Sequence, residues 1–387
     1  MHQQILPNPF QKLSEDNGLI LRITALDDQC ILVLKNRPAP HYDRVWYKFT
    51  IHTKTWTKLP DLPAKQTRIG FVPNIIKHCD HVYITVVYSA LTFWRIKYQN
   101  GEFLSGWEQV PKVELSIYGF AMISDNTSQR IYFSGGYTYN DTYDDRITKK
   151  SLAYVDTQQT WNWKYTNMEA PMKRRDHKAI KVQDEIYLFG GFGYSDANES
   201  LGHIYKVHVF NIKTGKWRTA TNIPSDKNTK ELSISVVHDR WIIFTNRKGV
   251  DAFFVLDTRS NLWYSGGGKH GFSFLQGYDH LKMVSLNDSI VFVLRQEEEP
   301  QQNIFYSMPY QWLHPWIAVG DIVSLQQLVF HGRAAPKKIS NSSSPSSDQV
   351  KNDLIVIQKL ILDLNDDLFR TTLSFLIYKS NSRIVTQ

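Results

Sequence analysis

Cysteines, signal-like segments and membrane-spanning segments are scarce or missing in this chain. Only two cysteines, Cys30 and Cys79, occur among 387 residues, so neither a disulfide framework nor a cysteine-based metal site is expected. No stretch of about 18 apolar residues is present, which argues against a membrane-spanning helix. Residues 1–8 have neither the basic start nor the apolar core of a signal peptide. We therefore expect a protein of the cytoplasm, or of the nucleus, whose cysteines are free thiols.

Sequence motifs of common catalytic sites are also missing. There is no Gly-x-Ser-x-Gly segment, and the glycines at 266–268 lack the spacing of a phosphate-binding loop. The densest group of metal-binding residue types is His78-Cys79-Asp80-His81, but consecutive side chains rarely converge on one ion. We interpret this group as a solvated turn, and we expect no catalytic residue, no metal and no other cofactor. Enzymatic activity is therefore not the favoured interpretation.

Positive charge is in excess but is not concentrated. The formal net charge is +8, and the 45 Lys and Arg residues are spread along the chain. Nucleic-acid binding would require a continuous basic stripe, which the sequence does not indicate. We interpret most of this charge as solvated surface.

Aromatic residues, in contrast, are abundant and follow a repeated arrangement. They make up 13% of the chain, and its 20 Tyr and 20 Phe suit strands better than helices. Four segments run from an apolar stretch through a short polar segment to a tryptophan: Phe49–Trp56, Tyr154–Trp161, Phe210–Trp217 and Leu256–Trp263. Together with Trp107, these tryptophans recur about every 50 residues, a period typical of propellers and solenoids.

Each period contains four strand-like segments. The second segment is an apolar run, and in two repeats it ends in a glycine pair, Gly135-Gly136 and Gly190-Gly191. Glycine at such a place permits a positive φ or a close approach of two backbones. Short strands with turn signals between them, and no convincing long helix before about residue 317, predict a closed all-β array.

One repeat carries a family resemblance. The segment Ile186 to Gly191, preceded by Arg175-Asp176-His177 and followed by Val209-Phe210-Asn211 and Trp217, resembles a kelch repeat. The resemblance extends over roughly residues 5–310, and it implies a propeller similar to the central domain of galactose oxidase, in which each repeat forms one four-stranded blade. The copper site of that enzyme type would need a cysteine crosslinked to a tyrosine. Cys30 begins an apolar strand and Cys79 lies in the turn described above, so we expect ordinary thiols at both. The resemblance is informative about fold rather than function.

The repeat count predicts a six-bladed kelch-type β-propeller over residues 1–316. The last repeat lacks a convincing fourth strand, because Pro309 and Pro315 flank the candidate segment. The N-terminal segment Pro9 to Leu13 reads like Thr55 to Leu59, with Phe in place of Trp. We therefore expect residues near 8–14 to supply the outer strand of the last blade and so to close the ring.

Residues 317–387 are expected to form a C-terminal tail of different character. The sequence predicts a helix near 317–329 and two helices within 352–379, separated by a disordered linker near 332–351 that is rich in Ser and Pro. The apolar stripe within residues 352–379 is expected to be buried against another surface. It would pack on the propeller, bind a partner helix, or associate with a second copy of the chain.

In a four-stranded blade, the loops between second and third strands lie on the same face as the connections between blades. In this chain these segments are rich in tyrosine and arginine, which binding hot spots favour. The candidate binding residues are Tyr42, Arg44, Arg68, Tyr137, Tyr139, Tyr143, Arg174, Arg175 and Tyr194. We expect an interaction module, either a scaffold or an adaptor, that binds a protein or peptide on this face.

The alternative is a propeller enzyme or a carbohydrate-binding protein with its site at the central channel. Such a site would concentrate carboxylates, histidines or an ion at the channel mouth, whereas an adaptor would show a broad aromatic and charged rim. His177 and His280 occupy repeat positions that face neighbouring strands. We therefore expect them to have hydrogen-bonded structural roles rather than catalytic ones.

Overall fold

The chain consists of two compact units, Met1–Met308 and Pro309–Gln387. The computed structural model describes residues 11–16, 19–36, 44–62, 73–87, 91–110, 117–138, 152–158, 161, 163–166, 170–194, 201–224, 232–245, 253–265, 278–296 and 302–310. Every element within these ranges is a β-strand, so the prediction of an all-β array is confirmed for this part of the chain. The tail expected at 317–387, with its linker at 332–351, lies outside the described residues.

Six antiparallel sheets of four or five strands follow one another along the chain. Sheet 1 contains β2 (Leu19–Ala25), β3 (Cys30–Asn36), β4 (Arg44–Thr50) and β5 (Thr55–Lys58). Sheet 2 contains β6 (Ile75–His78), β7 (His81–Val87), β8 (Leu91–Gln99) and β10 (Glu108–Gln109), with β9 (Glu102–Phe103) also paired to β8. Sheet 3 contains β12 (Ala121–Asp125), β13 (Arg130–Ser134), β15 (Leu152–Asp156) and β16 (Trp163–Tyr165).

The remaining three large sheets follow the same plan. Sheet 4 contains β18 (Lys178–Val182), β19 (Glu185–Phe189), β22 (His208–Asn211) and β23 (Lys216–Thr219). Sheet 5 contains β24 (Ser233–Val237), β25 (Trp241–Thr245), β26 (Phe253–Asp257) and β27 (Leu262–Ser265). Sheet 6 contains β28 (Tyr278–Ser285), β29 (Ser289–Gln296), β30 (Asn303–Pro309) and, from the other end of the unit, β1 (Gln11–Asp16).

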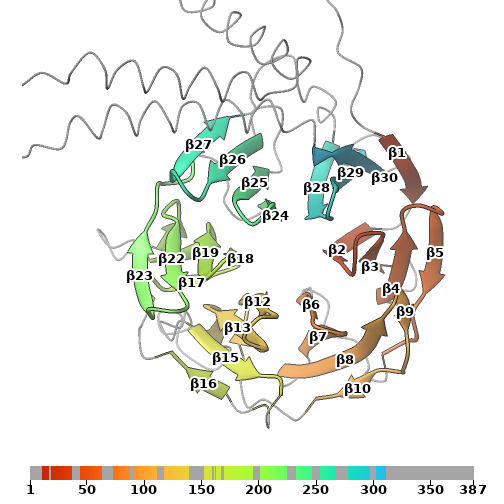
Figure 1. Ribbon diagram of the computed structural model, residues 1–387, viewed down its shortest axis with the longest axis horizontal. Helices are drawn as coiled ribbons and strands as arrows, with labels where there is room; N and C mark the ends of the chain where they lie inside the picture. Colours follow the sequence, from red (N-terminus) through yellow and green to blue (C-terminus); the bar gives the residue numbers. More distant parts are fainter. Residues whose placement is uncertain are drawn as a thin grey trace, which may run out of the picture. The chain divides into compact units, whose positions relative to one another are not determined.

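The first strands of the six sheets surround a common axis (Figure 1). They contact one another in the cyclic order β2, β6, β12, β18, β24, β28 and back to β2. Each sheet therefore has two neighbours, and its faces are turned toward them. This explains why the second strand of each sheet is so apolar: all five residues of β25 and the first six of β3 are buried, as expected of strands covered on both faces.

The repeated tryptophans join neighbouring sheets. A tryptophan at or near the outer strand of one sheet contacts an aromatic ring of the sheet that precedes it around the ring. The pairs and their centroid distances are Trp56 with Phe305 (5.2 Å), Trp107 with Trp46 (6.4 Å), Trp161 with Tyr83 (5.3 Å) and Trp263 with Phe189 (6.3 Å). Trp217 packs against a core cluster shared by sheets 3 and 4. The period read from the sequence is thus the period of the contacts between sheets.

Strand β1 brings residues from the start of the unit onto its last sheet. It pairs antiparallel with β30, from Gln11 opposite Ser307 to Asp16 opposite Asn303. Leu13, 6% exposed, belongs to the core cluster between sheets 6 and 1, and Trp56 Nε1 lies 3.3 Å from Ser14 Oγ. Residues 8–10 of the expected closing strand lie outside the described ranges.

The substitution Leu13→Ala tests how much this pairing stabilises the ring. It removes a buried side chain from the cluster between sheets 6 and 1, so we expect the free energy of unfolding to fall by about 2–4 kcal/mol. Gln11 is exposed on the same strand, and Gln11→Ala should change stability by no more than about 0.5 kcal/mol. Urea unfolding of both variants measures this, and equal stabilities would contradict the role given to β1.

Candidate functional site

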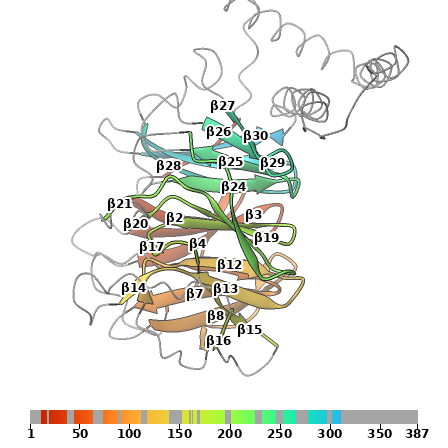
Figure 2. The ribbon, with the colours of Figure 1, turned by 90° about the vertical axis from the view of Figure 1, so that its left-hand side faces the viewer.

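Two small sheets join the connections between large sheets to loops within them. Strand β11 (Ile117–Tyr118) pairs with β14 (Tyr137–Thr138), and β17 (Arg174–Arg175) pairs with β20 (Phe192–Tyr194), which pairs with β21 (Leu201–His203). In each case a strand from a connection is hydrogen-bonded to a strand that follows the second strand of a large sheet. Figure 2 shows β14, β17, β20 and β21 on the same side of the ring. We call this side the connection face.

The segment 174–177 runs through a narrow gap between sheets 3 and 4, where the glycine pairs line its path. Gly136 N donates a hydrogen bond of 2.9 Å to Arg174 O, and Gly135 has a φ of 61°. A Cβ atom on Gly135 would lie 2.3 Å from Arg174 O, and one on Gly191 would lie 2.5 Å from Arg175 O. No side chain fits at these distances, so the glycine pairs are required for the connection to pass.

Arg174 lies in the interior and not on the connection face. It is 1% exposed, Nη1 donates to Leu188 O at 3.3 Å and to Gly190 O at 3.5 Å, and Nη2 lies against His208 Nδ1. Burial lowers the pKa of Arg174 to about 9, so the side chain is still charged at neutral pH. This differs from the sequence expectation of a binding residue, because alternate residues of a strand point to opposite sides and Arg174 is the inward member.

Arg175 is the outward member and lies between two aromatic rings. Its guanidinium carbon is 4.9 Å from the ring centroid of Tyr137 and 5.3 Å from that of Phe192. Nη1 lies 3.9 Å from Asp176 Oδ2, and the Arg175 side chain is 26% exposed. The rings come from β14 and β20, the small-sheet strands that follow the second strands of sheets 3 and 4. They hold the guanidinium at the junction between these sheets, with part of its surface open to solvent.

The other candidate binding residues are described only in part. Tyr42, Arg68, Tyr139 and Tyr143 lie outside the described residues. Tyr194 ends β20, but its side chain is not among those described. Arg44 begins β4 on sheet 1 and is partly exposed, which separates it from the pair Tyr137 and Arg175 at the junction of sheets 3 and 4. Phe192 is not among the candidate binding residues read from the sequence, although it follows a glycine pair directly.

The substitution Gly135→Ala tests the passage of the connection. The added methyl group would overlap Arg174 O, and φ is in the left-handed region, so we expect a loss of about 2–4 kcal/mol in the free energy of unfolding. The matched control is Gly202→Ala, since no heavy atom lies within 4 Å of a Cβ at Gly202. A thermal unfolding series that finds the two variants equally stable would show that the gap can widen without cost.

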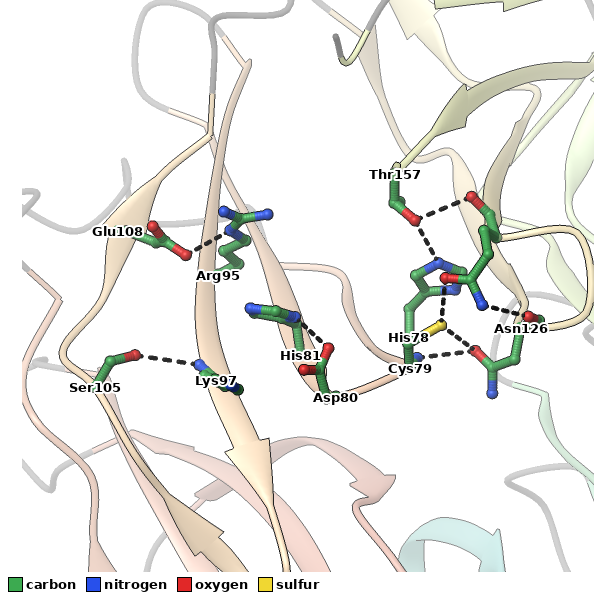
Figure 3. Close-up of polar contacts among 11 residues, drawn as sticks. His78, Cys79, Asp80, His81, Arg95, Lys97, Ser105, Glu108, Asn126 and Thr157 are labelled. Carbon is green, nitrogen blue, oxygen red and sulfur yellow. Dashed lines mark hydrogen bonds and ion pairs between the residues drawn. The ribbon is translucent and has the colours of Figure 1, made fainter. Parts of the chain in front are cut away.

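The group His78-Cys79-Asp80-His81 runs from the last residue of β6 through a two-residue turn to the first residue of β7, and part of it bridges two sheets (Figure 3). His78 is 1% exposed, with Nδ1 2.8 Å from Ser124 Oγ and Nε2 3.0 Å from Thr157 Oγ1. Ser124 is on β12 of sheet 3, and Thr157 follows β15 of the same sheet. Cys79 N donates to Asn126 Oδ1 at 2.9 Å, and Cys79 Sγ donates to Gln129 Oε1 at 3.1 Å.

The expectation of a solvated turn therefore fails for His78. A neutral imidazole has one donor and one acceptor nitrogen, so one of the two hydroxyls donates to the ring, although Ser124 Oγ also lies 2.9 Å from Asn126 Oδ1 and Thr157 Oγ1 lies 2.9 Å from Gln129 O. Burial, the largest cause, lowers the pKa of His78 to about 4, and the positive charge of Lys77 acts in the same direction. The uncharged His78 side chain therefore connects sheets 2 and 3. Its neighbours in the sequence give no indication of these partners.

Protonation of His78 at acidic pH should lower the free energy of unfolding. The folded state holds the His78 pKa at about 4, below the ordinary value near 6.5, so the unfolded chain binds more protons between these values and stability falls as pH falls. Between pH 7 and pH 5 we expect this histidine to remove about 2 kcal/mol of stability. In His78→Gln that part of the pH dependence should vanish, while acidic groups still contribute equally in both proteins. Urea unfolding at the two pH values measures the difference, and parallel losses in both proteins would contradict it.

The described residues hold no group of three or more His, Cys, Asp or Glu side chains able to bind a metal ion. Cys30 is buried, Cys79 is partly exposed, and both are free thiols. His177 is 4% exposed, with Nε2 3.2 Å from Ser134 Oγ, which agrees with a structural role. The side chain of His280 lies outside those described. In this part of the chain no helix is long and apolar enough to cross a membrane.

Residues 103–293 match the KLHDC2/KLHL20/DRC7 Kelch-repeats domain family. The matched region begins in sheet 2 and ends in sheet 6, so it includes both glycine pairs and the whole junction of sheets 3 and 4. No curated protein matches the chain.

Proposed function

We propose, from the premise that this chain belongs to the kelch-repeat family, that it is a scaffold or adaptor that binds a protein or peptide. Kelch-repeat domains generally mediate interactions between proteins. In this proposal the six large sheets are the six blades of one propeller, and the closed cycle of contacts among their first strands supports that count. Its connection face is the surface that the partner meets.

The observation that carries the proposal is the setting of Arg175. A guanidinium held between two aromatic rings has already lost much of its rotational freedom, so binding costs it less entropy. Its charge and N–H groups are partly exposed, and arginine and tyrosine are the residue types that most often dominate binding energies. Tyr137 and Arg175 are therefore the centre of the proposed surface.

The remaining candidates belong to the rim of this proposed surface. These are Tyr42, Arg44, Arg68, Tyr139, Tyr143 and Tyr194, all from loops or strand ends that the repeat pattern assigns to the connection face. Arg174 supports the surface from beneath, through its hydrogen bonds to Leu188 O and Gly190 O. Its substitution would disturb the fold and would not report on binding.

Two single variants test the proposal, Arg175→Ala and Tyr137→Ala. The wild-type chain is used for affinity capture from its source cells, and the dissociation constant of each captured protein is then measured with purified chains. Loss of a hot-spot residue costs about 2 kcal/mol or more, so we expect affinity to fall by roughly 30-fold in each variant.

The matched control is Arg259→Ala. Arg259 is exposed in the turn between β26 and β27, a turn between third and fourth strands that lies on the opposite face of a blade. This variant should bind with wild-type affinity. If it weakens binding while Arg175→Ala and Tyr137→Ala do not, the partner binds elsewhere and the connection face is excluded.

A further inference from the structure

The turn between β8 and β9 is an Asn-Gly pair. Gln99 pairs with Glu102, so the loop consists of Asn100 and Gly101 alone, and their φ values are 52° and 81°. Two left-handed residues in a two-residue hairpin are typical of a type I′ turn. Asn100 is exposed, and no heavy atom lies within 4 Å of a Cβ built on Gly101. The asparagine amide is therefore in contact with solvent, and the space beside the glycine is open.

This turn is also a contact between sheets 1 and 2. Lys48 on β4 donates from Nζ to Gly101 O at 2.8 Å, and the same nitrogen lies 3.3 Å from Glu102 Oε1. Lys48 is 7% exposed, whereas the Glu102 side chain is 73% exposed. The Gly101 carbonyl is thus the closer and less exposed partner of a buried ammonium group. Loss of this carbonyl would leave that group poorly paired, which is costly in the interior.

An asparagine followed by glycine can undergo a reaction that needs only water. The backbone nitrogen of Gly101 attacks Cγ of Asn100, and Nδ2 leaves as ammonia with the proton that the backbone nitrogen held. Water then opens the five-membered ring. Cleavage between Gly101 N and Cγ gives aspartate, whereas cleavage between that nitrogen and the backbone carbonyl carbon of residue 100 gives isoaspartate. Glycine favours the first step, because it has no Cβ to restrict the approach of its nitrogen.

We propose that Asn100 is a site of spontaneous deamidation, and that its isoaspartate form weakens the junction of sheets 1 and 2. Isoaspartate adds one atom to the main chain between Cα of residue 100 and Gly101 N. A two-residue turn of defined type has no slack for this atom, so Gly101 O is displaced from Lys48. The turn follows a third strand and lies on the face opposite the connection face, so the proposal is independent of partner binding.

Peptide mapping by mass spectrometry of the full chain, kept at pH 8 and 37 °C, tests the modification. We expect the change from amide to acid to appear at Asn100 about ten times faster or more than at Asn287. Asn287 is the matched control, because it is exposed in the connection between β28 and β29 but is followed by Asp288, which has a Cβ. A protein isoaspartate methyltransferase, which labels isoaspartate and not aspartate, should label the peptide that contains residue 100.

Thermal unfolding before and after this incubation tests the effect on the junction. Incubation should lower the melting temperature of the wild type by at least about 2 °C more than that of Asn100→Gln, whose longer side chain closes a ring slowly. Both proteins keep the other Asn-Gly pair, Asn17-Gly18, which lies outside the described residues, so any change there cancels in the comparison. Asn100→Asp adds the charge without the extra main-chain atom and should melt with the fresh wild type.

Three results would contradict the proposal. Equal rates at Asn100 and Asn287, or conversion of Asn100 without isoaspartate, would exclude the modification as proposed. Equal losses of melting temperature in the wild type and Asn100→Gln would exclude its effect on the junction. The role of Lys48 is tested by Lys48→Met, which replaces the buried ammonium by an apolar group. Incubation should lower the melting temperature of this variant no more than that of Asn100→Gln, and a loss as large as in the wild type would contradict the part given to Lys48.

Discussion

The packing of one sheet against the next is the constraint on which the rest of this structure depends. The core is divided among the junctions between sheets, and each hydrophobic cluster contains residues of two neighbours, as in the cluster of sheets 1 and 2 and that of sheets 4 and 5. A sheet alone would expose both apolar faces of its second strand. The sheets therefore stabilise one another only as a closed array, as expected of repeat architectures, and the pairing of β1 with β30 supplies the last sheet with an outer strand.

The same constraint explains the shape of the connection face. A connection between sheets must enter the junction that it spans, and at sheets 3 and 4 the backbone of residues 174–177 does so between two glycine pairs. Because Arg174 and Arg175 form strand β17, their side chains point to opposite sides. One guanidinium satisfies backbone carbonyls inside the junction, and the other lies between aromatic rings at its surface. The fold and the proposed binding surface thus depend on opposite sides of the same two-residue strand, β17.

The sequence predicts what repeats, but it does not predict the side-chain contacts that follow no repeat. The tryptophan period and the glycine pairs recur in the chain, so the all-β array and the kelch resemblance could be read from them. The inward side of Arg174 depends on the register of a two-residue strand, which has no pattern of its own. His78 looked like part of a solvated turn because its partners, Ser124 and Thr157, are 46 and 79 residues away in sequence. The aromatic neighbours of Arg175 were equally hidden, because they come from two different sheets.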